Sequence, residues 1–142
     1  MKHTLIDFTY DAITHTYLVR LGTDMGEFTG SAQCKPEDYD VEASYFGYEL
    51  AEVKANIKYC KAQYHHWDAR ARALTEFWLA MSTTRTYSEK DFWVKKMRQE
   101  VDDAFNKRTY WNDRYNDLKE AYHYRVVEAD KLNKQRRAKH YD

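Results

Sequence analysis

Apolar and aromatic residues recur along the middle of the chain at alternating intervals of three and four residues. The repeat is unbroken over ten positions: Leu50, Val53, Ile57, Cys60, Tyr64, Trp67, Ala71, Leu74, Trp78 and Met81. This heptad spacing keeps one stripe of an α-helix facing a partner helix, whereas a β-strand alternates every two residues. It therefore predicts a helix over about 44–82 that packs along a second helix as in a coiled coil.

A second helix is predicted over about 88–138, beginning at Ser88. The Ser88 hydroxyl can cap the free amides, Asp91 occupies the third helical position, and Tyr87 and Phe92 flank the cap as a hydrophobic staple. A less regular seam runs along this helix through Val94, Met97, Val101, Ala104 or Phe105, Trp111, Tyr115, Leu118, Tyr122, Val126, Ala129 and Leu132. A connection of about six residues makes the two helices antiparallel neighbours in a hairpin.

The first 34 residues alternate with a period of two instead. Turn residues separate three β-rich runs: 5–12, 17–21 and 27–32. Residues 12–15 fit either a turn or the end of a long first strand. Ile6, Phe8 and Tyr10 predict one apolar strand face, which needs a covering layer because three strands alone are not stable. The second helix is longer than the first, so we expect residues 126–138 to pack near this sheet.

These patterns predict an α+β fold. An N-terminal three-stranded antiparallel β-meander precedes a long antiparallel, coiled-coil-like helical hairpin. Residues 1–42 hold the sheet and an acidic connector, residues 43–142 hold the hairpin, and the two make one folded unit. Aromatic residues make up 16% of the chain, and the two helical seams carry more Tyr and Trp side chains than a two-helix hairpin can bury. This excess predicts a homodimer or higher oligomer along the helices.

The charge balance excludes two classes of function. Lys and Arg number 23, Asp and Glu number 23, and the formal net charge is zero. A general nucleic-acid binder needs a positive excess and a DNA mimic a negative one. The balance conceals a net charge of −6 over residues 1–49, with an acidic run at 37–42, and a basic run from Lys131 to Lys139. The acidic run is interpreted as a solvated connector and the basic run as a solvated helix end, with a dedicated polyanion contact as the alternative for the basic run.

No targeting segment or membrane span is evident, and Cys34 and Cys60 suit reduced thiols, so a cytoplasmic protein is expected. His65 and His66 follow Cys60 by five and six residues, a spacing at which helical side chains do not converge on a metal. The acidic run 37–42 has no recognisable base or nucleophile beside it. We therefore predict no enzyme activity, no cofactor and no metal site.

Arginine and aromatic residues interleave over 107–115, in the middle of the second predicted helix. Trp111 fits the seam, whereas Arg108, Tyr110 and Arg114 point elsewhere. The candidate binding residues are Arg98, Arg108, Tyr110, Trp111 and Arg114, with Arg70 and Arg72 on the first helix. Pairing about a turn centre near residue 85 places Arg70 and Arg72 nearer Arg98 than Arg108. This chemistry suits a protein interface or a nucleotide-type ligand, and it equally suits arginine stems covering a Tyr-rich core.

The segment 28–40, followed by Gly47 and by 51–55, resembles a module of small uncharacterised proteins from phages and mobile elements of Gram-positive bacteria. The shared pattern is a strand, then G-x-A-x-C-x-P-E-D, which spans residues 30–38 here, then a glycine and a helix. From the residues themselves, Gly30 ends the strand or allows a bulge, Cys34 is a small buried residue, and Pro36 starts a helical turn. Gly47 lets the first helix approach the strand backbone closely. The pattern transfers no active site.

This resemblance implies a phage or prophage accessory protein that counters bacterial antiviral defence in the host cytoplasm. Three hypotheses follow. The protein inhibits a defence protein by binding it, as anti-CRISPR proteins do. Alternatively, it sequesters a cyclic nucleotide-type signal, as Thoeris anti-defence proteins do. A third possibility is a structural factor in phage assembly, for which the hairpin serves oligomerisation only.

Overall fold

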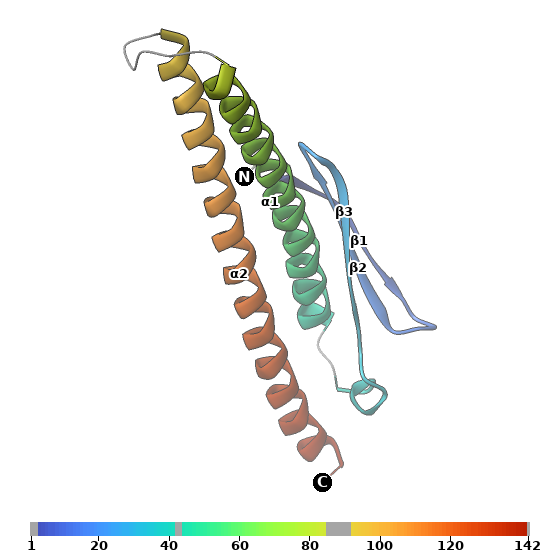
Figure 1. The fold of residues 1–142 in the computed structure, drawn as a ribbon. Helices are drawn as coiled ribbons and strands as arrows, with labels where there is room; N and C mark the ends of the chain where they lie inside the picture. Colours follow the sequence, from blue (N-terminus) through green and yellow to red (C-terminus); the bar gives the residue numbers. More distant parts are fainter. Residues whose placement is uncertain (1–2, 42–43, 85–91, 142) are drawn as a thin grey trace. The chain divides into compact units, whose positions relative to one another are not determined.

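A computed structural model describes residues 3–41, 44–84 and 92–141 (Figure 1). Its elements, in chain order, are β1 (His3–Asp11), β2 (Thr16–Thr23), β3 (Gly26–Gln33), the short 3₁₀ helix η1 (Pro36–Asp38), α1 (Ser44–Thr84) and α2 (Phe92–Tyr141). The strands form one antiparallel sheet in the order β1-β2-β3. The predicted meander followed by two long helices is therefore confirmed.

The chain divides into two compact units. The sheet unit comprises Met1–Tyr59 and Tyr115–Asp142, and the hairpin unit comprises Cys60–Arg114. The division runs through both helices and leaves the sheet with those helical turns that pack on it. The predicted boundary between 42 and 43, the connection between the helices, and the predicted Tyr87, Ser88 and Asp91 cap all lie outside the described residues.

Both predicted seams face inward. All ten seam positions of α1 are buried or half-buried, as are the α2 positions from Val94 to Ala129. Leu132 is the exception, because its side chain is 37% exposed and the adjacent Asn133 is buried instead. Within the described residues, neither helix contains an apolar stretch long enough to cross a membrane.

The core of the sheet unit lies between the β2–β3 half of the sheet and the first turns of α1. Its buried side chains are Tyr17, Val19, Leu21, Ala32, Ala51 and Ala55. Gly30 pairs with Val19 in the middle of β3, and a Cβ there would collide with the α1 backbone at Ala51 and Ala55. The expectation that Gly30 ends the strand or makes a bulge is therefore wrong, because this glycine allows helix and strand backbones to touch.

Gly47 also differs from its expected role. The space that a Cβ would take at Gly47 is filled by the ring of Tyr17, not by strand backbone. Tyr17 is only 5% exposed, so the missing side chain lets a large aromatic ring lie flat beneath α1. Cys34 and Pro36 behave as predicted, since Cys34 is buried after β3 and Pro36 begins η1.

A bulge in β1 changes which residues face the helices. Leu5 pairs with Leu21 and Asp7 pairs with Arg20, so Ile6 is an extra residue with no partner of its own. The Ile6 side chain lies beside Gly22, where a Cβ would be 3.2 Å from its Cδ1. The predicted Ile6, Phe8, Tyr10 face is therefore wrong at Ile6, since a one-residue shift turns that side chain to the other side.

Phe8 and Tyr10 of β1 make aromatic contacts on the inner face of the sheet, as expected. Phe8 meets Tyr48 of α1 at a ring-centre distance of 4.9 Å, and Tyr10 meets Tyr17 at 4.8 Å. Both stay half open to solvent, with Phe8 55% exposed and Tyr10 43% exposed. The inner face of β1 is thus only partly covered, whereas that of β2 is buried.

Residues 12–15 form the turn between β1 and β2. The carboxylate of Asp11 accepts hydrogen bonds from the backbone amides of Ile13 at 2.8 Å and Thr14 at 3.3 Å. These bonds lower the pKa of Asp11, since they favour its charged form. His15 completes the turn with a positive φ of 52°, which resolves the alternative in favour of a turn.

Candidate functional site

The centre of the hairpin unit is a charged cluster built on Asp68. Its carboxylate lies 3.1 Å from Nε of Arg72, one helical turn along α1, and 3.2 Å from a guanidinium nitrogen of Arg108 on α2. Beside it, the ammonium of Lys107 lies 4.4 Å from the ring centre of Trp67. This cluster joins α1 to α2 through one carboxylate and one cation–aromatic contact.

The electrostatics of this cluster favour the charged pair. Partial desolvation acts to raise the pKa of Asp68, but the hydrogen bond from Arg108 and the charge of Arg72 outweigh it. The pKa of Asp68 therefore lies below its usual value. Asp68 offsets only one of the two arginine charges, so the group of Arg72, Asp68 and Arg108 keeps a net positive charge.

Arg72 does not lie where the expected pairing put it. The structure brings Arg72 to the same carboxylate as Arg108, whereas the expected pairing set Arg72 nearer Arg98. The ion pair between Asp68 and Arg108 sets these two residues opposite each other, so the pairing of the helices is centred on residue 88 rather than 85.

Two further candidates are drawn into the packing between the helices. Trp111 is half-buried, as its seam position predicts. Arg114 is half-buried too, and its Nε is enclosed with no hydrogen-bond partner among the described residues. Burial raises the pKa of the nearby Cys60 thiol, and the charge of Arg114 only partly opposes this shift. A thiol held neutral in this way is a core residue and not a nucleophile.

The other three candidates remain on the surface. Tyr110 is 52% exposed and packs edge-on against Trp111 at 5.0 Å between ring centres. Arg70 and Arg98 are exposed, and neither forms an ion pair with a residue that the structure describes. Arg72 is also on the surface, since its side chain is 74% exposed although it binds Asp68. The seven candidates thus separate into three half-buried side chains, Arg108, Trp111 and Arg114, and four exposed ones.

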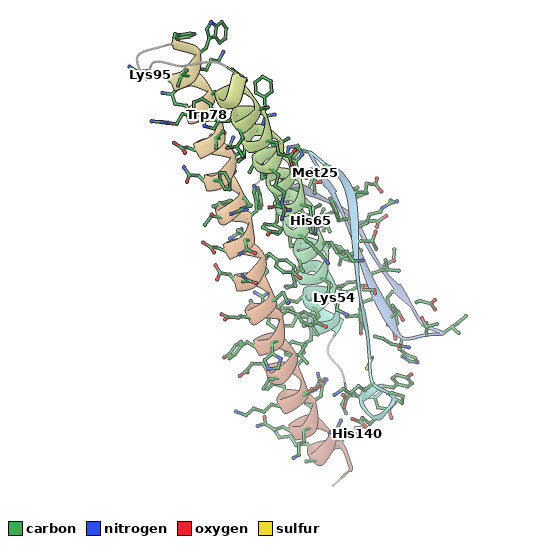
Figure 2. The ribbon with its side chains drawn as sticks, in the orientation of Figure 1. Met25, Lys54, His65, Trp78, Lys95 and His140 are labelled. Atoms are coloured by element: carbon green, nitrogen blue, oxygen red, sulfur yellow. The ribbon has the colours of Figure 1, made fainter. Side chains whose placement is uncertain are left out.

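The sequence interpretation missed a group of exposed apolar side chains where α1 ends and α2 begins. These are Phe77 at 52%, Leu79 at 56%, Phe92 at 69% and Trp93 at 67% exposure. Side chains project outward around this end of the hairpin, near the labelled Trp78 and Lys95 (Figure 2). Phe77 and Leu79 flank the seam residue Trp78, so their position beside the seam is the signal that could have revealed them.

In the sheet unit, the acidic run meets the basic run. The buried carboxylate of Asp38 binds the guanidinium of Arg137, and Glu37 lies 3.7 Å from the same group. Lys35 and Asp130 form a second bridge at 3.0 Å. The interpretation of both runs as merely solvated charge is therefore wrong at Asp38 and Arg137. These contacts also confirm that the end of α2 packs near the sheet.

Within the described ranges, no group of three or more His, Cys, Asp or Glu side chains is placed to hold a metal ion. The most strongly organised charges are the pairs at Asp68 and Asp38, and both join elements of the fold. The described surface also exposes large apolar and aromatic side chains. In comparisons with protein-family models, curated proteins and solved structures, nothing matches this chain.

Proposed function

We propose that this chain is a non-enzymatic binding protein that captures another protein through the apolar end of its helical hairpin. The observation that carries the proposal is the exposure of Phe77, Leu79, Phe92 and Trp93, each more than half open to solvent. Large exposed apolar and aromatic side chains are typical of interaction sites, and aromatic side chains supply much of the binding energy in protein interfaces.

The placement of the candidate residues favours a protein partner over a nucleotide-type ligand. Stacking on a base and binding a phosphate requires an aromatic ring and arginine donors that converge on one ligand. Arg72 and Arg108 are held at Asp68, and Arg114 is half-buried. Phe92 and Trp93 expose large aromatic surfaces at the hairpin end, which suits contact with an apolar protein surface.

The class of partner comes from the resemblance of residues 28–40 to phage accessory proteins. On that basis the proposed partner is a bacterial antiviral defence protein, met in the host cytoplasm and inhibited by binding. The mechanism needs no catalysis: the hairpin end occupies a surface that the defence protein requires for assembly or for access to its target.

The proposal is tested in a bacterium that carries one defence system at a time. Expression of the chain is expected to restore phage plaques against one system, and the purified chain is expected to bind one protein component of it. The double variant Phe92→Ser/Trp93→Ser should lose both effects. Ile13→Ser is the matched control, because Ile13 is an equally apolar side chain, 91% exposed, in the β1–β2 turn.

Two results contradict the proposal. One is a wild-type chain that restores plaques against none of the systems and binds none of their components. The other is restoration that persists in Phe92→Ser/Trp93→Ser, with a nucleotide released from the heated wild-type protein. That second result favours the signal-sequestering alternative.

A further inference from the structure

The geometry of α2 points to an antiparallel homodimer in which this helix packs along the same helix of a second copy. The contact surface, here called the α2 stripe, consists of six exposed side chains: Asp117, Glu120, Tyr124, Val127, Lys131 and Lys134. All six belong to the sheet unit. This inference does not depend on the proposed function, which concerns the other end of the hairpin.

The α2 stripe has the spacing of a coiled-coil seam on the face turned away from α1. Its members follow one another at intervals of three, four, three, four and three residues. Two apolar side chains occupy its centre, with Tyr124 65% exposed and Val127 52% exposed. The same three-and-four alternation marks the buried seams, so this helix carries a second stripe of the geometry that a partner helix needs.

The order of charge along the α2 stripe selects the partner and its direction. Two acidic residues come first, the apolar pair follows, and two basic residues come last. A two-fold axis between Tyr124 and Val127 sets Asp117 against the second copy's Lys134, and Glu120 against the second copy's Lys131. A parallel arrangement would set like charges together. The stripe is therefore complementary to itself only when antiparallel.

The four charges are available for such pairing. None of them forms an ion pair with any residue in the described part of the chain. Two neighbouring charges on the inner side of α2 do form ion pairs within the chain: Arg125 binds Glu49 at 2.9 Å and Asp130 binds Lys35 at 3.0 Å. The inward charges Arg125 and Asp130 of α2 are thus paired within the chain, whereas the four charges of the α2 stripe are exposed in an order that is complementary to itself.

A groove beside the α2 stripe widens the apolar contact. It has a volume of about 360 Å³ and is lined by Tyr45, Phe46, Glu49, Ala121, Tyr124, Arg125 and Glu128. Tyr45 is 65% exposed at its edge. The stripe itself spans about 26 Å of helix, at 1.5 Å per residue. An interface of this length with charged ends is expected to be weak and sensitive to salt.

Sedimentation equilibrium tests the dimer. The wild-type chain should dimerise in about 50 mM salt and dissociate progressively as screening increases. The variants Asp117→Lys/Glu120→Lys and Lys131→Glu/Lys134→Glu each set like charges together, and each should raise the dimer Kd by roughly tenfold or more. An equimolar mixture of the two variants should form a heterodimer, because every pair is then opposite in sign. Circular dichroism checks that both variants stay helical.

Two further measurements isolate the surface and the direction. Glu76→Lys/Asp102→Lys makes the same change in net charge as the first variant at exposed positions of the hairpin unit, and it should leave the Kd unchanged. A mixture of Glu120→Cys and Lys131→Cys chains should form a disulfide-linked dimer, whereas Glu120→Cys alone should not.

Any of four results would overturn the inference. The first is a wild-type chain that stays monomeric at low salt up to about millimolar concentration. The second is a pair of charge variants that dimerise as tightly as the wild type, and the third is a control variant that loses dimerisation to the same extent as the charge variants. The fourth is a cross-link formed by Glu120→Cys alone, which would require a parallel arrangement.

Discussion

Replacing Gly30 with alanine tests the closest packing in the sheet unit. A Cβ at residue 30 would lie 2.6 Å from the amide nitrogen of Ala55 and 3.0 Å from the carbonyl carbon of Ala51. Both atoms belong to the backbone of α1, so no side-chain rotation relieves the collision. An ordinary contact between such atoms needs about 3.5 Å. The helix must therefore move away from β3, or the sheet must bend.

The cost follows from what that movement uncovers. Val19 and Leu21 beneath α1, and Ala51 of α1 itself, are each at most 2% exposed, and all three lose contacts when the helix lifts. Overpacking a core costs about 1–3 kcal/mol, and a backbone collision belongs at the upper end of that range. Alanine recovers about 0.5–1 kcal/mol because it is less flexible than glycine in the unfolded chain. The net loss of unfolding free energy is expected to be about 2 kcal/mol.

Urea unfolding followed by circular dichroism measures this loss. With a slope of about 2 kcal/mol per molar urea, the midpoint of Gly30→Ala should fall by about 1 M. Gly22→Ala is the control, because a Cβ there would meet side-chain atoms and no backbone: Cδ1 of Ile6 at 3.2 Å, Cγ1 of Ile6 at 3.4 Å and Oγ1 of Thr4 at 3.5 Å. Its midpoint should shift by less than about 0.3 M. Equal midpoints for Gly30→Ala and the wild type would refute the direct contact of helix and strand backbones.

Three further predictions concern the charge pairs and the thiols. Arg137→Met leaves the buried carboxylate of Asp38 without its partner and should lower the unfolding free energy by about 3–5 kcal/mol in urea titrations; a loss no larger than that of a surface substitution would contradict the buried pair. Asp68→Asn should be less stable than the wild type at neutral pH. Since the pKa of Asp68 is lowered in the folded state, its contribution is complete above the unfolded pKa of about 3.9 and is lost as the pH falls through the folded value. The stability difference between the two proteins should therefore shrink as the pH falls below about 3.9. Cys34 and Cys60 are buried, and burial also raises the pKa of Cys60. Both thiols should therefore react with a disulfide reagent only as fast as the chain opens. Immediate reaction of either thiol in the folded protein would contradict this placement.

Some candidate residues could be placed from the sequence and others could not. Trp111 could be placed from its seam position alone, because a regular heptad repeat states which helical face is buried. The Asp68 cluster could not, because it depends on which residue of α2 lies opposite Asp68. That register is set by the tertiary contact itself, since the Asp68–Arg108 pair centres the pairing of the helices on residue 88 and not on residue 85 as expected.

The exposed apolar end of the hairpin was only partly predictable. Phe77 and Leu79 lie beside the seam residue Trp78, and that position indicates side chains outside the buried stripe. The Phe92 side chain is 69% exposed, whereas its expected staple with Tyr87 lies outside the described residues. How far each side chain is covered depends on the surfaces around it in three dimensions, which local spacing does not determine.

The sequence by itself determined the element types and their order in this protein. Helical and strand periodicities are local properties, since each follows from the geometry of a few consecutive residues. Only the tertiary structure decided that Ile6 is bulged out of β1, that Gly30 receives the backbone of α1, and that Asp38 is buried against Arg137. Each of these three features depends on contact with a segment that is distant in the sequence. Close packing decides which side chains fit at such a contact, and the contact exists only in the folded chain.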